Sequence, residues 1–192
     1  MKLDFFTPMC NFEEPFPRII TKNSFSDERG FFVENYKQSY FQEQGISDIF
    51  VQDNMSVSHK GVFRGLHFQR KPFETSKLVS VLNGEIIDFI VDLRPNSKTY
   101  TWYETVHLTA ENKKMLYVPG GYAHGFLSLE NNTIVTYKCS CEYNYQYDAG
   151  IRYDDPDIGI QFPFDMIKFI SEKDRNLPYL KNIEDYYKGF NK

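Results

Sequence analysis

Short runs of β-forming residues, separated by turn residues, divide this sequence and constrain what it can fold into. Asn83-Gly84 stands between the runs 77–82 and 85–92, and an Asn-Gly pair in that setting predicts a two-residue β-hairpin. Arg94-Pro95-Asn96-Ser97 then turns the chain again. Because several short runs at this spacing are typical of a sandwich or a barrel, we expect an all-β fold.

Helix is expected only at the periphery. Residues 39–44 are long enough for one or two helical turns, and the segment after Pro156 is predicted to be mostly loop with little helix. A short strand at 115–118 is closed by Pro119-Gly120-Gly121. No internal repeat, linker or low-complexity block interrupts the chain, so we predict one domain over residues 1–192.

Two of the runs alternate with the period of a β-strand. In 51–58, one face carries Gln52, Asn54, Ser56 and Ser58, and the other carries Val51, Met55 and Val57. In 133–143, one face carries Val135, Tyr137, Cys139, Cys141 and Tyr143. The polar face of the first run suits either solvent or a barrel interior, and the tyrosines of the second suit either a core or that same interior.

Composition argues against several classes of function. The net charge of −4 gives no general attraction to nucleic acid or to an acidic membrane surface. No stretch approaches the ~20 apolar residues of a membrane span, and the N-terminus lacks a signal-peptide pattern. Three cysteines, Cys10, Cys139 and Cys141, do not suggest a disulfide framework. We therefore expect a cytoplasmic protein with reduced thiols.

Two glycine-flanked histidine segments carry the main functional signal. Residues 61–69 read Gly-Val-Phe-Arg-Gly-Leu-His-Phe-Gln, and residues 119–126 read Pro-Gly-Gly-Tyr-Ala-His-Gly-Phe. Each resembles half of a cupin metal site, which needs several His and carboxylate ligands on one ion. However, Gln69 stands where a second ligand histidine is usual, and His59 and His107 lack ligand spacing. We expect a β-barrel pocket without a metal, suited to acid–base chemistry on an anionic ligand.

Arg64 and Lys77 strengthen the functional interpretation of His67, which by itself is more typical of a structural histidine. On a regular strand, positions 64 and 67 point to opposite faces. If both side chains reach one pocket, Gly65 must bulge or bend the strand. Arginine suits a phosphate, which it holds by two parallel hydrogen bonds. Lys77 begins the next run and would add a positive charge, although a strand-end lysine is more often solvated.

Charged segments lie near both ends of the chain. Ser171-Glu172-Lys173-Asp174 is expected in a polar loop. Asp27-Glu28-Arg29-Gly30 is a charged turn that leads into a strand, where Phe32 and Glu34 would project to the same side. An aromatic ring beside a carboxylate suits a nucleobase, but an ordinary edge strand has the same pattern.

Taken in chain order, these segments resemble the dTDP-4-dehydrorhamnose 3,5-epimerase family from about residue 17 to residue 180. The resemblance rests on segments 27–34, 52–58, 61–69, 77–79, 91–94, 119–126, 137–138 and 171–174. It implies a metal-free double-stranded β-helix, the cupin or jelly-roll barrel, with short peripheral helices. It also implies a homodimer that exchanges N-terminal strands. The substrate would be a nucleotide-diphosphate 4-keto sugar, epimerised without a cofactor, usually for a bacterial surface polysaccharide.

The resemblance also implies roles for individual residues. The four catalytic positions would be His67 as the base, Asp174 as its orienting carboxylate, Tyr137 as the acid and Lys77 as the group that stabilises the enolate. The substrate-binding positions would be Arg64 and His124 at the diphosphate, Gln52, Asn54 and Ser56 near the nucleotide and sugar, Tyr143 as a lining aromatic, and Arg29, Phe32 and Glu34 from the partner subunit.

Several alternatives stay open at the level of sequence. Residues 69–76 depart from the loop usual in the family, and 181–192 carry no family motif. The same catalytic residues would serve an enzyme that epimerises only C3 or only C5, or one that uses a GDP-linked sugar. A non-catalytic sugar-nucleotide-binding cupin and a metal-dependent cupin oxygenase are further alternatives. The nucleotide base, the sugar and the pathway are not determined by the sequence.

Overall fold

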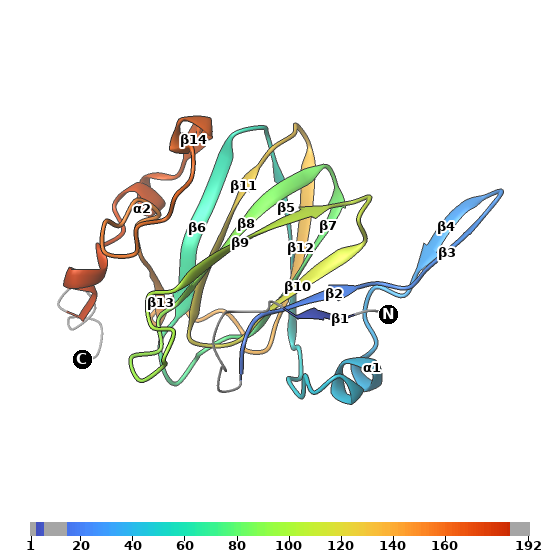
Figure 1. Cartoon of the computed structure of the whole chain (residues 1–192), viewed down its shortest axis with the longest axis horizontal. Coiled ribbons are helices and arrows are strands. Elements are labelled where there is room, and N and C mark those ends of the chain that lie inside the picture. Colours follow the sequence, from blue (N-terminus) through green and yellow to red (C-terminus); the bar gives the residue numbers. More distant parts are fainter. Residues whose placement is uncertain (1–2, 6–14, 185–192) are drawn as a thin grey trace.

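The structure, a computed structural model, describes residues 3–5 and 15–184 and is built almost entirely from β-strands (Figure 1). Cys10 lies outside the described residues. Two mainly antiparallel sheets face each other, and the short helices lie at the edges. The predicted all-β fold, a jelly-roll barrel with peripheral helices, is confirmed.

The first sheet has six strands, and all neighbouring strands are antiparallel. Their order across the sheet is β1 (Leu3–Phe5), β2 (Arg18–Thr21), β10 (Lys114–Val118), β7 (Lys77–Asn83), β12 (Thr133–Cys139) and β5 (Gln52–Ser58). The second sheet follows the order β13 (Asp148–Gly150), β6 (Val62–Gln69), β11 (Tyr122–Ser128), β8 (Glu85–Asp92) and β9 (Tyr103–Thr109). The two-residue strand β14 (Phe169–Ile170) joins it by pairing in parallel with β6.

In the described residues, the remaining elements with assigned bounds are a hairpin and four short helices. The hairpin consists of β3 (Ser24–Asp27) and β4 (Gly30–Val33). The helices are α1 (Gln38–Glu43), the 3-10 helix η1 (Phe164–Met166), α2 (Glu172–Arg175) and the 3-10 helix η2 (Leu180–Asn182). The expected helical turns near 39–44 are confirmed, and so is the scarcity of helix between Pro156 and residue 184.

The main core lies between the two sheets. Val79 and Val81 of β7 pack with Ile86 and Ile90 of β8 in one buried cluster. These β-branched side chains suit a pleated, buried surface, and their removal from water drives the sheets together. The core fills one part of the barrel and leaves another part open for the polar residues described below.

Asn83-Gly84 does not form the predicted hairpin. Strand β7 pairs with β10 and β12 in the first sheet, whereas β8 pairs with β9 and β11 in the second. Gly84 turns the corner between the sheets with a φ of 76°, and a side chain there would clash with Thr133. The sequence prediction fails because an Asn-Gly pair supplies a tight turn but does not determine which strands pair across it.

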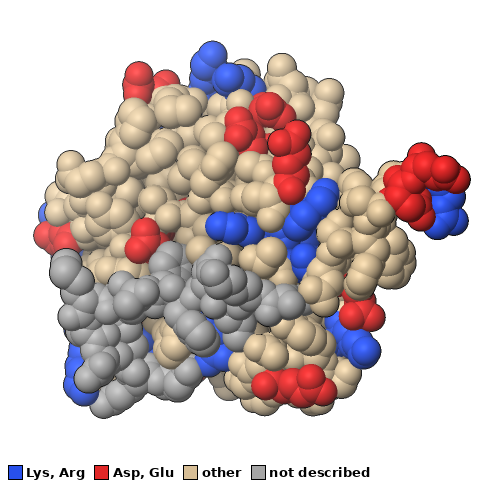
Figure 2. Space-filling model, turned by 45° about the vertical axis from the view of Figure 1, so that its right-hand side comes forward, with Lys and Arg blue, Asp and Glu red and all other residues tan. Residues whose placement is uncertain are grey.

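The β3–β4 hairpin stands out from the barrel (Figure 1) and carries charged residues at its tip (Figure 2). Three large apolar side chains on it are mostly exposed: Phe25 (64%), Phe31 (62%) and Phe32 (67%). A two-stranded ribbon without a covered face is only marginally stable alone in water. The hairpin therefore presents an uncovered aromatic surface on this single chain.

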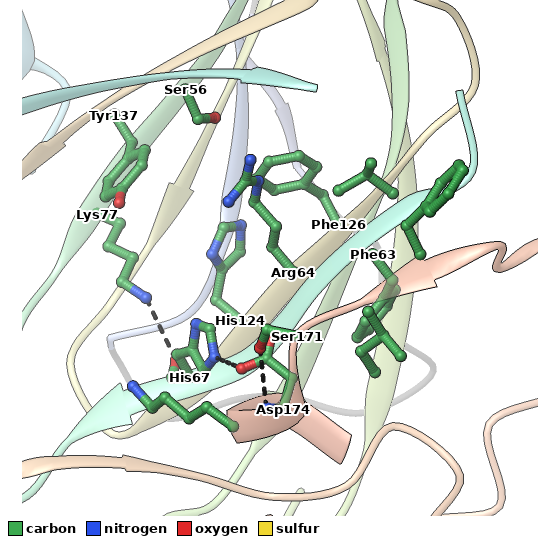
Figure 3. Close-up of a pocket in the computed structure, with 14 residues that line it drawn as sticks. Ser56, Phe63, Arg64, His67, Lys77, His124, Phe126, Tyr137, Ser171 and Asp174 are labelled. Carbon is green, nitrogen blue, oxygen red and sulfur yellow. Dashed lines mark hydrogen bonds and ion pairs between the residues drawn. The ribbon is translucent and has the colours of Figure 1, made fainter. Parts of the chain in front are cut away.

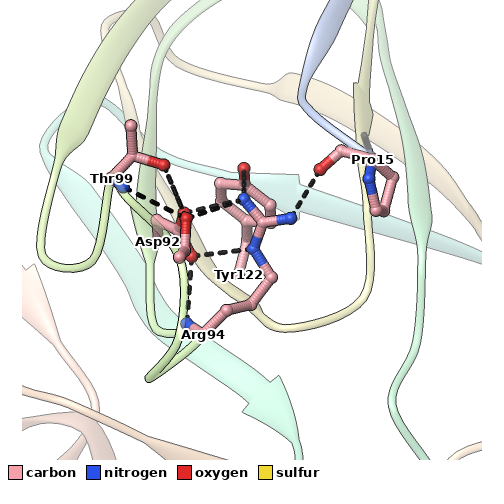
Figure 4. Close-up of polar contacts among 6 residues, drawn as sticks. Pro15, Asp92, Arg94, Thr99 and Tyr122 are labelled. Atoms are coloured by element: carbon pink, nitrogen blue, oxygen red, sulfur yellow. Dashed lines mark hydrogen bonds and ion pairs between the residues drawn. The ribbon is translucent and has the colours of Figure 1, made fainter. Parts of the chain in front are cut away.

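A polar network around Arg94 fastens the segment before β2 to the barrel (Figure 4). The guanidinium of Arg94 binds both carboxylate oxygens of Asp92, at 2.9 and 2.8 Å, and donates to the carbonyl of Pro15 at 2.7 Å. Burial would raise the pKa of Asp92, but hydrogen bonds from Arg94 and Thr99 lower it. Asp92 is thus a fully buried but well-compensated anion.

A second cluster packs the C-terminal segment against the second sheet. Phe63 of β6 and Phe89 of β8 contact Tyr153 and Phe162 respectively, with ring centroids 5.0 and 4.9 Å apart. Lys168 also donates its backbone N–H to the carbonyl of Gly61 at 2.8 Å. This packing brings helix α2 alongside strand β6, and thereby positions the site.

Candidate active site

A cavity of about 520 Å³ lies in the barrel, and most of the predicted residues line it (Figure 3). Its walls come from β5, β6, β7, β11, β12 and the segment 169–174. A smaller outer cavity of about 150 Å³ shares His67, Lys77, Tyr137 and Lys173 with it. Together the two form a pocket that is lined by both polar and apolar side chains, next to the apolar core.

His67 and Asp174 form a hydrogen-bonded pair at the wall of this pocket. His67 Nε2 lies 2.6 Å from Oδ1 of Asp174, and Oδ2 accepts the backbone N–H of Gly65 at 3.2 Å. The expected polar loop around Asp174 is a one-turn helix, α2, whose N-cap Ser171 accepts the N–H of Asp174. Burial would raise the pKa of Asp174, but the bonds from His67, Gly65 and Ser171 hold it below its usual value.

Arg64 and His67 both reach the pocket, because strand β6 is irregular at Gly65, as predicted. The pairing of β6 with β11 shifts register between His124 and Phe126, and Gly65 has a φ of 141°. A side chain on Gly65 would lie 2.5 Å from the Cα of Gly125. The two strands can approach this closely only because both positions are glycine.

Lys77 and Tyr137 enter the pocket from the first sheet, which faces β6. Lys77 Nζ donates to the carbonyl of His67 at 3.2 Å. Desolvation lowers the pKa of Lys77, although Cys139 and Asp88 act in the opposite direction. The pKa of Tyr137 is raised because its ring is buried, so its phenol stays protonated at neutral pH.

His124 lies opposite His67 on the neighbouring strand β11, and Asp88 lies behind it. His124 Nε2 is 2.8 Å from Oδ1 of Asp88, and both side chains are buried. Burial raises the pKa of Asp88 and lowers that of His124. Since Asp88 occupies Nε2, only Nδ1 of His124 is left to meet a ligand.

Strand β5 turns its polar face into the pocket and its apolar face outward. Ser56 lines the main cavity, while Gln52 and Asn54 line the outer one. The Ser56 hydroxyl is buried without a hydrogen-bond partner among the described residues. Met55 and Val57 on the other face are 67% and 53% exposed. The polar face is therefore the barrel interior and not the solvated surface.

Tyr143 lines the outer cavity but does not lie on the same strand as Tyr137, which corrects the strand predicted over 133–143. Strand β12 ends at Cys139, whose pairing partner Gln52 is the first residue of β5. Beyond that point no strand backbone is left to pair with on β5. The N–H of Tyr143 instead donates to the side chain of Gln52 at 2.7 Å.

Arg29, Phe32 and Glu34 do not line the pocket of their own chain. They belong to the protruding hairpin and its continuation, and all three are exposed. Arg29 pairs with Asp27 at the hairpin tip, at 2.5 Å. Within this chain, the hairpin thus stands apart from the barrel that holds the other predicted residues (Figure 1).

The pocket contains residues that the sequence analysis did not single out. Lys173 lines both cavities and pairs with Asp148 of β13. Phe126 and Phe169 add aromatic surface to the main cavity. Lys173 directly precedes Asp174 in the quoted segment, which was its only signal. No sequence pattern indicates Asp148, because its contact with Lys173 depends on the pairing of β13 with β6.

Within residues 3–5 and 15–184, no group of three or more His, Cys, Asp or Glu side chains is placed to hold a metal ion. No helix in the described part of the chain is long and apolar enough to cross a membrane.

Comparison with known proteins places this arrangement in a family. The model of the dTDP-4-dehydrorhamnose 3,5-epimerase family matches residues 17–182. The dTDP-4-dehydrorhamnose 3,5-epimerase of Methanothermobacter thermautotrophicus is 51% identical over 170 residues, which cover 88% of this chain and 91% of that protein.

Two solved structures share the fold. One is dTDP-6-deoxy-D-glucose-3,5-epimerase RmlC of Legionella pneumophila in complex with dTDP-4-keto-L-rhamnose. Its TM-score is 0.85 and its sequence identity is 39%, and the match covers 92% of this chain and 96% of that chain. The other is ChmJ, a 3'-monoepimerase of Streptomyces bikiniensis in complex with dTDP-quinovose. Its TM-score is 0.81 and its sequence identity is 30%, and the match covers 88% of this chain and 86% of that chain. With its motifs, barrel and pocket, this chain belongs to the dTDP-4-dehydrorhamnose 3,5-epimerase family.

Proposed function

We propose that this protein is a nucleotide-sugar epimerase that inverts C3 and C5 of a dTDP-linked 4-keto-6-deoxyhexose. The observation that carries the proposal is the 2.6 Å pairing of His67 with Asp174 in a cavity that also contains Tyr137. His67 comes from the second sheet and Tyr137 from the first. Inversion at carbon needs a base on one face of the sugar and a proton donor on the other, and this arrangement supplies both.

His67 is the proposed base for both carbons. The C–H bonds at C3 and C5 are acidic because each lies next to the C4 ketone, so proton removal leaves an enolate with its charge on O4. Asp174 holds the imidazole in one tautomer and stabilises the imidazolium that forms. Tyr137 then gives its phenolic proton to the opposite face of the carbon. Solvent restores both side chains before the second carbon reacts.

Lys77 is the proposed partner of the enolate oxygen. Its amine lies inside the pocket and donates to the carbonyl of His67, close to the base. A fixed donor in a desolvated site stabilises a developing negative charge better than water does. The proposed chemistry uses no metal or redox cofactor, since protons leave and return on side chains.

The remaining pocket residues are proposed to bind the nucleotide diphosphate. Arg64 has a guanidinium suited to phosphate, and Nδ1 of His124 is free to contribute beside it. The partnerless hydroxyl of Ser56 supports a polar ligand at that wall. Gln52, Asn54 and Tyr143 line the outer cavity, where the nucleotide end of the substrate is proposed to lie.

We propose a homodimer in which the β3–β4 hairpin of one subunit reaches the pocket of the other. Arg29, Phe32 and Glu34 would then contact the nucleotide from the partner side. Support comes from the exposed rings on the hairpin and from the exposed apolar face of β5, both of which are unusual on an isolated subunit. We further propose a cytoplasmic location and a role in making a deoxysugar for a surface polysaccharide.

The decisive experiment follows solvent deuterium into the sugar by NMR. Purified protein in D₂O is given dTDP-linked and GDP-linked 4-keto-6-deoxyhexoses in parallel. We expect exchange and inversion at both C3 and C5 of the dTDP-linked sugar. Exchange at C3 alone would indicate a monoepimerase, as in the ChmJ relative. Turnover of the GDP-linked sugar only would reassign the nucleotide, and binding without exchange would indicate a non-catalytic protein.

A further inference from the structure

Tyr143 combines two properties that are rarely found together. Its side chain is 59% exposed at the outer cavity, yet its backbone is held on both sides and its hydroxyl is tied down. The N–H of Tyr143 donates to Gln52 Oε1 at 2.7 Å, and its hydroxyl donates to Asp148 at 3.1 Å. An exposed ring in a surface loop normally has no such restraints.

One buried side chain, Gln69, supplies the restraints on the two neighbours of Tyr143. Gln69 Nε2 donates to the carbonyl of Glu142 at 3.2 Å, and Gln69 Oε1 accepts the N–H of Asn144 at 2.6 Å. The peptide groups before and after Tyr143 are thus held by the two ends of one amide. Gln69 is only 9% exposed, although its side chain borders the outer cavity, so these bonds are largely shielded from competing water.

The same amide connects a second loop. Gln69 Nε2 is also 2.7 Å from Thr75 Oγ1 and 3.0 Å from the carbonyl oxygen of Phe73, so its two N–H groups are shared among three acceptors. The rings of Phe73 and Tyr147 close the contact between the two loops, with centroids 4.6 Å apart. Gln69 is therefore the point at which the loops 70–76 and 140–147 are fastened to the end of strand β6.

We propose that Gln69 is a positioning residue for substrate binding, which holds Tyr143 as a preformed platform for the nucleotide end of the substrate. The inference rests on the proposed function, in which the outer cavity takes the nucleotide. A ring that is already fixed loses little freedom when a base or ribose packs on it, so less binding energy is spent on ordering the loop. Gln69 acts through Tyr143 and takes no part in proton transfer.

The test is a double-mutant cycle between Gln69→Ala and Tyr143→Ala, read by calorimetric binding of dTDP and by steady-state epimerisation. We expect Gln69→Ala to weaken dTDP binding about tenfold and to raise KM similarly, while kcat stays within about twofold. In the Tyr143→Ala background, Gln69→Ala should have almost no further effect, because the platform is already gone.

Two further variants keep the test decisive. Gln161→Ala is the matched control, because Gln161 also donates to a loop carbonyl, that of Gly159 at 3.1 Å, but lies outside both cavities. It should leave dTDP binding unchanged. If Gln69→Ala fails to fold, Thr75→Val removes one acceptor of Gln69 at nearly constant volume and should weaken dTDP binding in the same direction, severalfold.

Several outcomes would overturn the inference. Equal weakening by Gln69→Ala with and without Tyr143 would mean that Gln69 does not act through that ring. A fall in kcat at constant KM would show that Gln69 acts in the proton-transfer steps and not in substrate binding. If the wild-type protein binds dTDP and exchanges protons but Gln69→Ala binds dTDP equally well, the inference about Gln69 is refuted and the proposed function is not. A wild-type protein that neither binds dTDP nor exchanges protons would refute the proposed function together with it.

Discussion

His67 and Asp174 are 107 positions apart in the chain, yet His67 Nε2 and Asp174 Oδ1 lie 2.6 Å apart. The contact depends on the packing of the C-terminal segment against β6, where β14 pairs with Val62 and Phe63. Gly65 then donates its backbone N–H to the Asp174 carboxylate, and Ser171 accepts the backbone N–H of Asp174. The histidine is thus oriented by an element from the other end of the chain.

We predict that Asp174→Asn lowers kcat by a factor of about 10² to 10⁴, because the amide no longer fixes the required tautomer or stabilises the imidazolium.

His67→Ala should abolish deuterium exchange at both carbons. Both variants are measured by NMR, with circular dichroism as the control for folding. Substantial exchange at either carbon in His67→Ala would show that another group is the base.

Tyr137→Phe is expected to separate proton removal from inversion. The variant keeps the ring in place but has no phenolic proton to give to the far face, so His67 returns the proton to the original face. Deuterium should enter the sugar without a change in configuration. Inversion at the wild-type rate would mean that the acid is a different group.

Lys77→Met should reduce kcat by a factor of about 10² to 10³, since the enolate loses its fixed cationic donor. Lys77→Arg should retain more activity than Lys77→Met, because it preserves the charge but not the compact geometry of the amine. Steady-state kinetics compare the two at saturating substrate. Equal activity of Lys77→Met and wild type would exclude this role.

Mixed dimers test whether the hairpin acts in the partner subunit. His67→Ala protein is unfolded and refolded with a triple variant that replaces Arg29, Phe32 and Glu34 by alanine. If the hairpin crosses over, half of the sites in each heterodimer are intact. About one quarter of wild-type activity should return in a statistical mixture. No recovery above the two parent proteins would place the hairpin at its own pocket.

Lys22 gives a prediction about stability and pH. Its buried amine donates to Ser80 at 2.7 Å and to Asn35 at 3.1 Å. Burial, with a smaller effect from Lys113, lowers the pKa of Lys22 to about 8, below the 10.5 of an unperturbed lysine. Between these values the unfolded chain binds more protons at this position than the folded chain, so the free energy of unfolding rises with pH.

The free energy of unfolding should therefore increase from pH 8 to pH 10.5 relative to that of Lys22→Met, by up to roughly 3 kcal/mol. Urea denaturation at equal protein concentration measures both proteins at each pH. Taking the difference between them removes the contribution of the other titrating groups. A difference that stays constant or shrinks as the pH rises would show that the Lys22 pKa is not lowered by folding.

Sequence patterns were sufficient to predict structural features that depend only on residues close together in the chain. The irregularity at Gly65 was predicted because Arg64 and His67 have opposite parity on a regular strand. The corner at Gly84 was predicted wrongly as a hairpin, because the turn itself is local but the choice of pairing strands is not. The sequence pattern puts Tyr143 on the strand of Tyr137, since alternation continues in the sequence beyond Cys139, where the pairing with the first residue of β5 stops.

By itself, the sequence determined the all-β class, the polar face of β5, and the family, because each depends on residue order and period within short segments. Only the tertiary structure decided that Asp174 meets His67, that Tyr137 and Lys77 enter the pocket from the facing sheet, and that Gln69 holds the loop of Tyr143. These contacts join residues from separate segments, and burial of the two sheets and of the C-terminal segment brings them together. Hydrophobic packing has no sequence period that identifies partners across such distances, so the polar contacts it creates are visible only in the folded chain.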